Sequence, residues 1–291
     1  MRHFLLSLAT LLAPLAAQAA PPQLLLQTAT FRSLDQAQHK GGEVEIYVTV
    51  PVRPLTYRQR APRSFQAAAV VDLSIVKADG QPAWQETVTL KPPVLTDTTV
   101  SIKNPLSFLK RVNLPDGTYT LRGKVRDQYK PANGETTVEL PLTVAAPAGP
   151  AFSDVIFLSR PATKADGQSN FNRGGYLLTR APGNYYGRGA DNIFFYTELS
   201  QLPASRPVVL HYHVENAEGF AADADADPIS PTVGRPTTVV GQLPLGPLPA
   251  GPFTLTVTAR DAATKKVLAT QSQQGTRSLT EYAPAGAALP R

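Results

Sequence analysis

The sequence predicts an all-β protein that consists of two tandem immunoglobulin-like β-sandwich domains after a signal peptide. Three observations carry this prediction. Proline occurs 28 times in 291 residues, about twice the average usage of about 5%, and proline interrupts helices. Short segments with apolar side chains at every second position recur, separated by proline and glycine, and no amphipathic helix is evident. One of these segments is repeated at a domain-sized offset.

Residues 1–19 have the layout of a secretory signal peptide. A basic start with Arg2 precedes an apolar run over residues 4–16, and the small residues of Ala17-Gln18-Ala19 follow. The run is too short for a membrane-spanning helix of about 20 residues, and no later segment has about 18 consecutive apolar residues. We therefore expect export to a periplasmic or extracellular location, and no transmembrane segment.

The first domain is expected over residues 20–145. Its clearest strand is 43–50, where Val44, Ile46 and Val48 point into a core and Glu43 and Glu45 lie on the exposed face. The same alternation or strand composition predicts further strands at 24–31, 65–76, 84–90, 98–103, 118–126 and 136–144.

A short uncharged segment of small residues and proline, 146–151, is expected to be the linker to the second domain. The second domain is expected over residues 152–275, and a flexible tail over 276–291. Strands are predicted here at 154–158, 193–199, 208–214, 253–260 and 266–271.

The repeat supports two copies of one module. Residues 114–121 align without gaps onto residues 248–255, and the register continues to Arg126-Asp127 and Arg260-Asp261, so the offset is 134 residues throughout. Each copy begins with turn residues and continues as an alternating strand. The aromatic residue early in each strand is expected to clamp a corner of an immunoglobulin-like sandwich.

Several strand motifs resemble those of the secreted Bacteroidota proteins that form the GWxTD-domain family. In the first half they are Val44-Glu45-Ile46-Tyr47-Val48-Thr49-Val50-Pro51, Leu55-Thr56-Tyr57 and Ala78-Asp79-Gly80. In the second half they are residues 152–158 and 192–199. The family's terminal Gly-Trp-x-Thr-Asp block is missing, since Trp84 is the single tryptophan. The resemblance implies an exported, non-enzymatic β-sandwich protein, and it transfers no functional residues.

Composition and the missing motifs argue against an enzyme, a thiolate metal site and a cofactor. The chain has no cysteine, so disulfides, thiolate metal sites and cysteine nucleophiles are excluded. Gly-x-Ser-x-Gly, His-Glu-x-x-His and phosphate-loop motifs are missing, and paired carboxylates such as Glu43 and Glu45 are predicted to lie on an exposed strand face. We expect no enzyme activity and no cofactor.

Two groups of residues are candidate binding sites. Tyr185, Tyr186 and Arg188 lie in a long glycine-rich loop, where exposed aromatic rings beside arginine can stack on sugars or anchor a partner. Tyrosines in such loops also fold back over sheet edges. Arg122, Lys124 and Arg126 form a basic stripe on one strand face, suited to an anionic surface or, more simply, to a solvated edge that resists aggregation.

Two further motifs suggest metal binding without meeting its requirements. Asp223, Asp225 and Asp227 have the spacing of a calcium loop, but Pro228 and Gly234 stand where that loop needs glycine and glutamate. His211 and His213 share one strand face with Glu215 but supply only two imidazole ligands. The simpler interpretation is a solvated acidic loop beside a polar strand.

The sequence therefore predicts an exported, non-enzymatic binding or structural module of the cell envelope. The alternatives are a carbohydrate-binding protein that uses Tyr185, Tyr186 and Arg188, and a two-domain periplasmic chaperone that pairs a strand edge with its clients. The expected partner is an envelope protein or a glycan. Nucleic acid is not expected as a partner, because the net charge is only +6 and the chain is predicted to be exported.

Overall fold

Every regular element in the described residues is a β-strand or a 3-10 helix of one turn, so the predicted all-β class is confirmed. The computed structural model describes residues 21–32, 41–100, 102, 104–202, 206–231, 234–246 and 248–279. The predicted signal peptide (1–19) and residues 280–291 of the predicted tail lie outside these ranges. Within them, no helix is long and apolar enough to cross a membrane.

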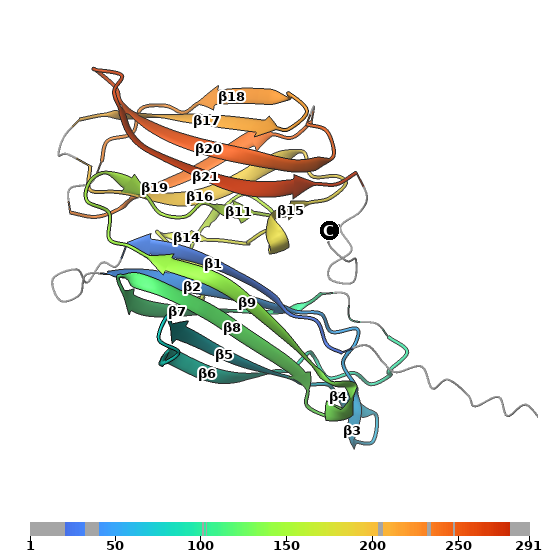
Figure 1. Ribbon diagram of the computed structural model, residues 1–291. Coiled ribbons are helices and arrows are strands. Elements are labelled where there is room, and N and C mark those ends of the chain that lie inside the picture. Colours follow the sequence, from blue (N-terminus) through green and yellow to red (C-terminus); the bar gives the residue numbers. More distant parts are fainter. Residues whose placement is uncertain are drawn as a thin grey trace, which may run out of the picture.

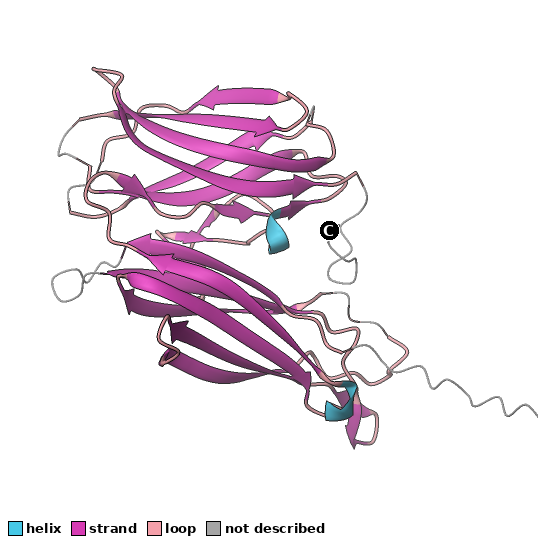
Figure 2. Cartoon of the chain, in the orientation of Figure 1, coloured by secondary structure: helices cyan, strands magenta, loops and turns pink. Residues whose placement is uncertain are grey.

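The N-terminal half forms a first pair of antiparallel sheets (Figures 1 and 2). One sheet has the order β1-β2-β7, with bounds Leu25–Arg32, Gly41–Val50 and Leu106–Pro115. The other has the order β6-β5-β8-β9, with bounds Pro82–Leu90, Ala69–Lys77, Gly117–Asp127 and Glu135–Val144. A small hairpin of β3 (Arg58–Ala61) and β4 (Ser64–Gln66) extends from one end. The 3-10 turn η1 (Pro131–Asn133) precedes β9.

The C-terminal half repeats this arrangement. Strands β10, β11 and β19 pair with β16, with bounds Ala151–Phe152, Ile156–Leu158, Thr237–Pro244 and Asn192–Ser200. The facing sheet has the order β15-β21-β20-β17-β18, with bounds Tyr185–Tyr186, Val267–Arg277, Gly251–Asp261, Val208–Asn216 and Ala221–Asp225. A third, small sheet has the order β12-β14-β13, with bounds Thr163–Lys164, Tyr176–Leu177 and Asn172–Arg173. The 3-10 turn η2 (Pro182–Asn184) precedes β15.

The sequence repeat corresponds to equivalent strands. β8 and β20 are its two copies, and each lies between the corresponding neighbours, β5 and β9 in one half and β17 and β21 in the other. The Tyr119 hydroxyl donates to the Pro115 carbonyl oxygen at 3.0 Å, the tyrosine-corner contact of immunoglobulin-like sandwiches. At the strand ends, the Asp127 and Asp261 carboxylates accept backbone N–H groups of the following loop.

Two predicted strands differ from the observed ones. Residues 98–100 and 102 are not in a strand, because Asp97 accepts the Thr99 N–H at 2.9 Å and closes a local turn there. The strand is β7 instead, a few residues later, where it pairs with β2 over its whole length. The predicted strand 65–76 is divided into β4 and β5. Residues 145–150 connect β9 to β10, and β21 extends two residues into the predicted tail.

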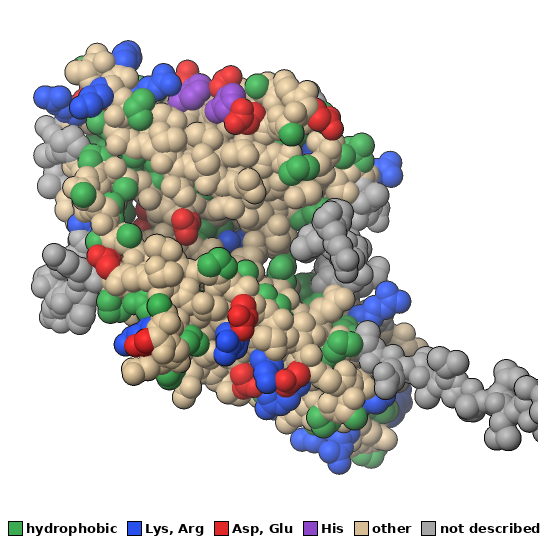
Figure 3. Space-filling model, in the orientation of Figure 1, with side chains coloured by type: hydrophobic (Ala, Val, Ile, Leu, Met, Phe, Trp, Pro, Cys, Tyr) green, Lys and Arg blue, Asp and Glu red, His purple; other side chains and the backbone are tan. Residues whose placement is uncertain are grey.

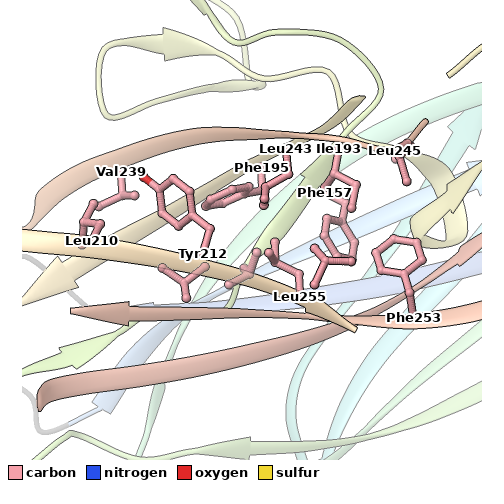
Figure 4. Packing of buried hydrophobic residues seen from close by; sticks show 14 of the residues in the cluster. Phe157, Ile193, Phe195, Leu210, Tyr212, Val239, Leu243, Leu245, Phe253 and Leu255 are labelled. Atoms are coloured by element: carbon pink, nitrogen blue, oxygen red, sulfur yellow. The ribbon is translucent and has the colours of Figure 1, made fainter. Parts of the chain in front are cut away.

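Each sheet pair encloses its own apolar core. In the second core, the rings of Phe157, Tyr186 and Phe253 contact one another at centroid distances of 5.7–6.2 Å. Phe195 meets Tyr212 edge-on at 4.9 Å (Figure 4). A third buried cluster joins the halves, with Ala29, Phe31, Tyr47 and Leu109 from one side and Ile156, Leu158, Leu178 and Tyr196 from the other. The sheet β1-β2-β7 and the sheet around β16 therefore face each other across this cluster, to which the region of the small sheet β12-β14-β13 contributes Phe171, Tyr176 and Leu178.

Candidate functional site

The face of β2 that was predicted to be exposed is the contact surface with the C-terminal half. Glu45 has no exposed surface, and Glu43 is only partly exposed. The prediction that this carboxylate pair faces solvent is therefore wrong. Alternation correctly assigned Val44, Ile46 and Val48 to the first core, but it could not show that the opposite face is covered by a second pair of sheets.

Arg173 of β13 pairs with the carboxylates of this acidic face, and Arg111 of β7 supplies a second cation, its Nε donating to Glu45 Oε1 at 2.8 Å. Arg173 Nη1 donates to Glu43 Oε1 at 2.5 Å and to Glu45 Oε1 at 2.9 Å, and its Nε donates to Glu198 Oε1 at 2.8 Å. The Arg173 guanidinium also lies 3.4 Å from the centre of the Phe31 ring. Burial lowers the pKa of Arg173, but the charges of Glu198 and Glu45 outweigh it and the net shift is upward. The cluster ties the two halves together through charges of which Glu45, Glu198 and Arg173 have little access to water.

A glycine permits this approach. Gly174 follows Arg173 with a φ of +54°, and a Cβ there would overlap the Tyr196 hydroxyl oxygen and lie 2.5 Å from Thr238 Oγ1. The neighbouring Gly175 also has a positive φ, +83°, but no atom lies within 4 Å of its hypothetical Cβ. The Arg173-Gly174-Gly175 turn can therefore lie flat against β16 and bring the guanidinium to Glu198.

A second arginine, Arg180, lies on Tyr47 at the same interface. Its guanidinium carbon is 3.9 Å from the ring centre, and its Nη2 donates to the Thr28 carbonyl oxygen at 3.3 Å. Its Nε and Nη1 are buried and have no hydrogen-bond partner among the described residues. Burial lowers the pKa of this guanidinium, although Tyr47 and Glu45 oppose that shift. The first half thus receives two buried arginines from the second.

Beside Arg180 the interface opens into a cleft of about 730 Å³, which we call the interface cleft. The first half contributes Gln27, Tyr47, Thr49 and Ser107, among others, and the second half contributes Arg160, Phe171, Arg180, Tyr185 and Arg188. Three of its lining residues are arginines and none is an aspartate or glutamate. Figure 3 shows the surface hollowed where the two sheet pairs meet.

The structure separates the two tyrosines of the predicted loop site. β15 pairs with the end of β21. Both tyrosines border the cleft, but Tyr185 is half-buried there, whereas Tyr186 packs into the second core. Tyr186 is 3% exposed, and its hydroxyl lies 3.1 and 3.0 Å from the carbonyl oxygens of Leu158 and Phe194. Burial raises its pKa. The expectation of an exposed Tyr186 ring is therefore wrong, whereas Tyr185 and Arg188 remain candidates.

The predicted basic stripe is neutralised by neighbouring strands. Arg122 is paired with Glu139 at 2.6 Å, Lys124 with Glu135 at 2.6 Å, and Arg126 with Asp72 at 2.5 Å. The acids come from β9 and β5, on either side of β8. The stripe therefore presents alternating charges instead of a cationic surface. Because β8 lies between β5 and β9, it is not a sheet edge, and the interpretation that its charges protect an edge from aggregation is wrong as well.

The two candidate metal motifs lie side by side. β17 and β18 pair in a register that sets His211 opposite Asp225 and His213 opposite Asp223. The Nδ1 atoms of His211 and His213 are each 2.8 Å from the facing carboxylate oxygen. Hydrogen bonding to Asp223 raises the pKa of His213. In the described ranges, no group of three or more ligating side chains is arranged to hold a metal ion. The sequence showed both motifs but not the register that joins them.

Comparisons with known proteins identify no family. No family model matches the sequence, and no curated protein is detectably similar to it. Solved structures with partial similarity include red sea bream transglutaminase, at 10% identity and a TM-score of 0.26, and Bacteroides uniformis β-glucuronidase 2, at 8% and 0.31. The first match covers 87% of this chain but only 31% of the transglutaminase, and the second covers 85% of this chain but only 28% of the glucuronidase. A β-glucuronidase of Bifidobacterium dentium matches at 11% identity and a TM-score of 0.27, over 88% of this chain and 48% of that one. These TM-scores are too low to support any inference about function.

Proposed function

We propose that this protein is an exported, non-enzymatic binding module of the cell envelope and that its ligand occupies the interface cleft. The ligand is anionic and has a flat or apolar face. The observation that carries this proposal is the composition of the cleft, since Arg160, Arg180 and Arg188 line it without any carboxylate. Glu45 and Asp154 lie close enough to Arg180 to offset part of its charge, whereas Arg160 and Arg188 form no ion pair with the described residues. Cations without opposing acids create a positive potential, which a cleft concentrates.

The walls of the cleft favour a ligand with some flat surface. Phe171 and Tyr185 are half-buried and line it beside the arginines, and aromatic rings stack on sugar rings and on planar acids. Tyr47 also borders the cleft, but it is buried and Arg180 covers its ring. Its volume of about 730 Å³ falls within the usual range for small-ligand sites, about 300–1,000 Å³. An acidic sugar fits this combination, and this supports the carbohydrate-binding alternative over a chaperone.

Calorimetry with a ligand panel tests the proposal. The panel contains uronic-acid oligosaccharides, neutral oligosaccharides of the same length and short acidic peptides. We expect binding of at least one acidic class, and at least tenfold weaker binding by R160Q/R188Q. The control R122Q removes a charge from a paired surface position and should bind as wild type does. Absence of binding by every acidic ligand, or equal binding by R160Q/R188Q, would refute the proposal.

The same calorimetric panel separates a glycan ligand from a protein partner. Binding of uronic-acid oligosaccharides that is lost in Y185A identifies a glycan site. Binding of acidic peptides alone indicates a protein partner that inserts an acidic segment between the two sheet pairs.

A further inference from the structure

The free end of the first sheet pair carries a cluster of basic residues outside the interface cleft. It consists of the β3–β4 hairpin and the loops beside it, and we call it the basic tip. Its members are all exposed: Arg53, Arg58, Arg60, Arg63, Lys91 and Lys130. Figure 3 shows blue side chains gathered over the hairpin, which Figure 1 places at the outer end of the first half.

Contacts hold these loops together. The Gln66 Nε2 donates to the Pro92 carbonyl oxygen at 2.5 Å, and Phe65 and Leu95 exchange backbone hydrogen bonds. These bonds fix the hairpin beside the loop that contains Lys91. On the other side, the Arg60 guanidinium lies 5.8 Å from the centre of the Tyr129 ring. The loop that contains Arg53 is held at the same end, because the Thr56 N–H donates to Asp127 at the end of β8. These contacts place the hairpin and the three loops that carry the other cations at one end of the sheet pair.

The basic tip differs from the stripe on β8 in its lack of counter-charges. Among the described residues, none of the six cations forms an ion pair, whereas Arg122, Lys124 and Arg126 all do. The nearby acids are occupied. Asp127 is buried and accepts the backbone N–H groups of Thr56 and Tyr129, and Glu135 pairs with Lys124. Asp97 is the exposed acid that remains, and it accepts the Thr99 N–H.

Exposed apolar side chains lie on the loop that borders the tip. Val94 is 53% exposed and Val100 is 58% exposed, and the same loop includes the exposed Pro93. Cations beside exposed apolar groups on a protruding element are suited to a flat anionic surface that has an apolar interior, since the cations meet headgroups and the apolar groups enter the boundary layer.

We propose that the basic tip binds the surface of an anionic phospholipid bilayer. The protruding hairpin fits a plane, whereas a long polymer would need a groove to follow. Each basic residue close to an anionic bilayer strengthens binding about fivefold. Because the attraction is electrostatic, it falls as salt shortens the screening length, which is about 10 Å at 0.1 M.

Vesicle sedimentation tests this assignment. The protein is recovered after export and mixed with vesicles of equimolar phosphatidylglycerol and phosphatidylcholine, or of phosphatidylcholine alone. We expect binding to the anionic vesicles only, and weaker binding as salt is raised. R58Q/R60Q/R63Q should lower the partition coefficient on the order of 100-fold, since three contributions of about fivefold multiply.

A charge-matched variant is the control. R260Q/K265Q/K266Q removes the same three charges around the turn between β20 and β21, in the other half of the molecule (Figure 1), and it should bind almost as wild type does. Circular dichroism confirms that both variants are folded. Equal losses in the two variants, or no binding to anionic vesicles at low salt, would overturn the assignment. Binding to soluble alginate but not to vesicles would also overturn it, and would point to an anionic polysaccharide.

Discussion

Replacing Arg173 is the sharpest test of how the two halves are joined. R173M keeps most of the side-chain length but removes the cation that contacts Glu43, Glu45 and Glu198. Glu45 has no exposed surface and Glu198 is 7% exposed, so both carboxylates stay in a medium where an uncompensated charge is costly. Removing one partner of a buried ion pair costs about 3–5 kcal/mol. Arg111 still donates to Glu45 at 2.8 Å, so we expect the lower part of that range.

Urea unfolding followed by far-UV circular dichroism measures this cost. With a slope of about 3 kcal/mol/M, the midpoint should fall by about 1 M. The matched control is R122M, which breaks the exposed Arg122–Glu139 pair and should cost about 0–1 kcal/mol. Adding E198Q to R173M removes the buried carboxylate whose ion pair was with Arg173 and should recover part of the loss. If R173M costs no more than R122M, the buried network does not stabilise the interface and the reasoning fails.

Three other variants test separate parts of the structure. G174A should lose at least about 2 kcal/mol of stability, because of its positive φ and the overlap with Tyr196, whereas G175A should lose about half as much; thermal unfolding compares them. Y186F should lose about 1–2 kcal/mol in urea unfolding, because the carbonyl oxygens of Leu158 and Phe194 lose their donor; an unchanged midpoint would contradict its buried role. Burial raises the pKa of Tyr212 to about 12, so the folded state holds this proton more tightly than the unfolded chain, whose tyrosines titrate near 10. The contribution of protonated Tyr212 to the free energy of unfolding is therefore complete below about pH 10 and is lost as the pH rises toward 12. Urea midpoints measured from pH 8 upward should decline less steeply in Y212F than in the wild type.

The local sequence patterns predicted where most strands lie and which side chains face the core of their own sheet pair. The repeat at residues 114–121 and 248–255 placed β8 and β20 correctly, because an alternating strand with a buried aromatic near its start carries its own packing face. β7 was predicted too early in the chain, since the turn at Asp97 and Thr99 has no strong sequence signature. The resemblance to the GWxTD-domain family, the signal peptide and the exported location remain predictions.

The candidate site depended on information that a strand pattern does not contain. Tyr185, Tyr186 and Arg188 were predicted together, but Tyr186 packs into the second core, whereas Tyr185 and Arg188 stay at the cleft. Arg173 and Arg180 were not singled out, because nothing nearby in the sequence marks an arginine whose partners in the first half, Glu43 and Thr28, are more than a hundred positions away. Glycines at 174 and 175 beside an arginine were the available signal.

The sequence by itself determined the β class, the repeated strand seen in β8 and β20, and the inward faces of β2, β8, β17 and β20, because these follow from neighbours along the chain. Only the tertiary structure decided which outward faces stay in water. The C-terminal half covers the outward face of β2 and buries Glu45, whereas the stripe on β8 stays exposed and paired. The physical reason is that alternation specifies two faces for a strand, while burial of the second face depends on a partner sheet that comes from the other half of the chain.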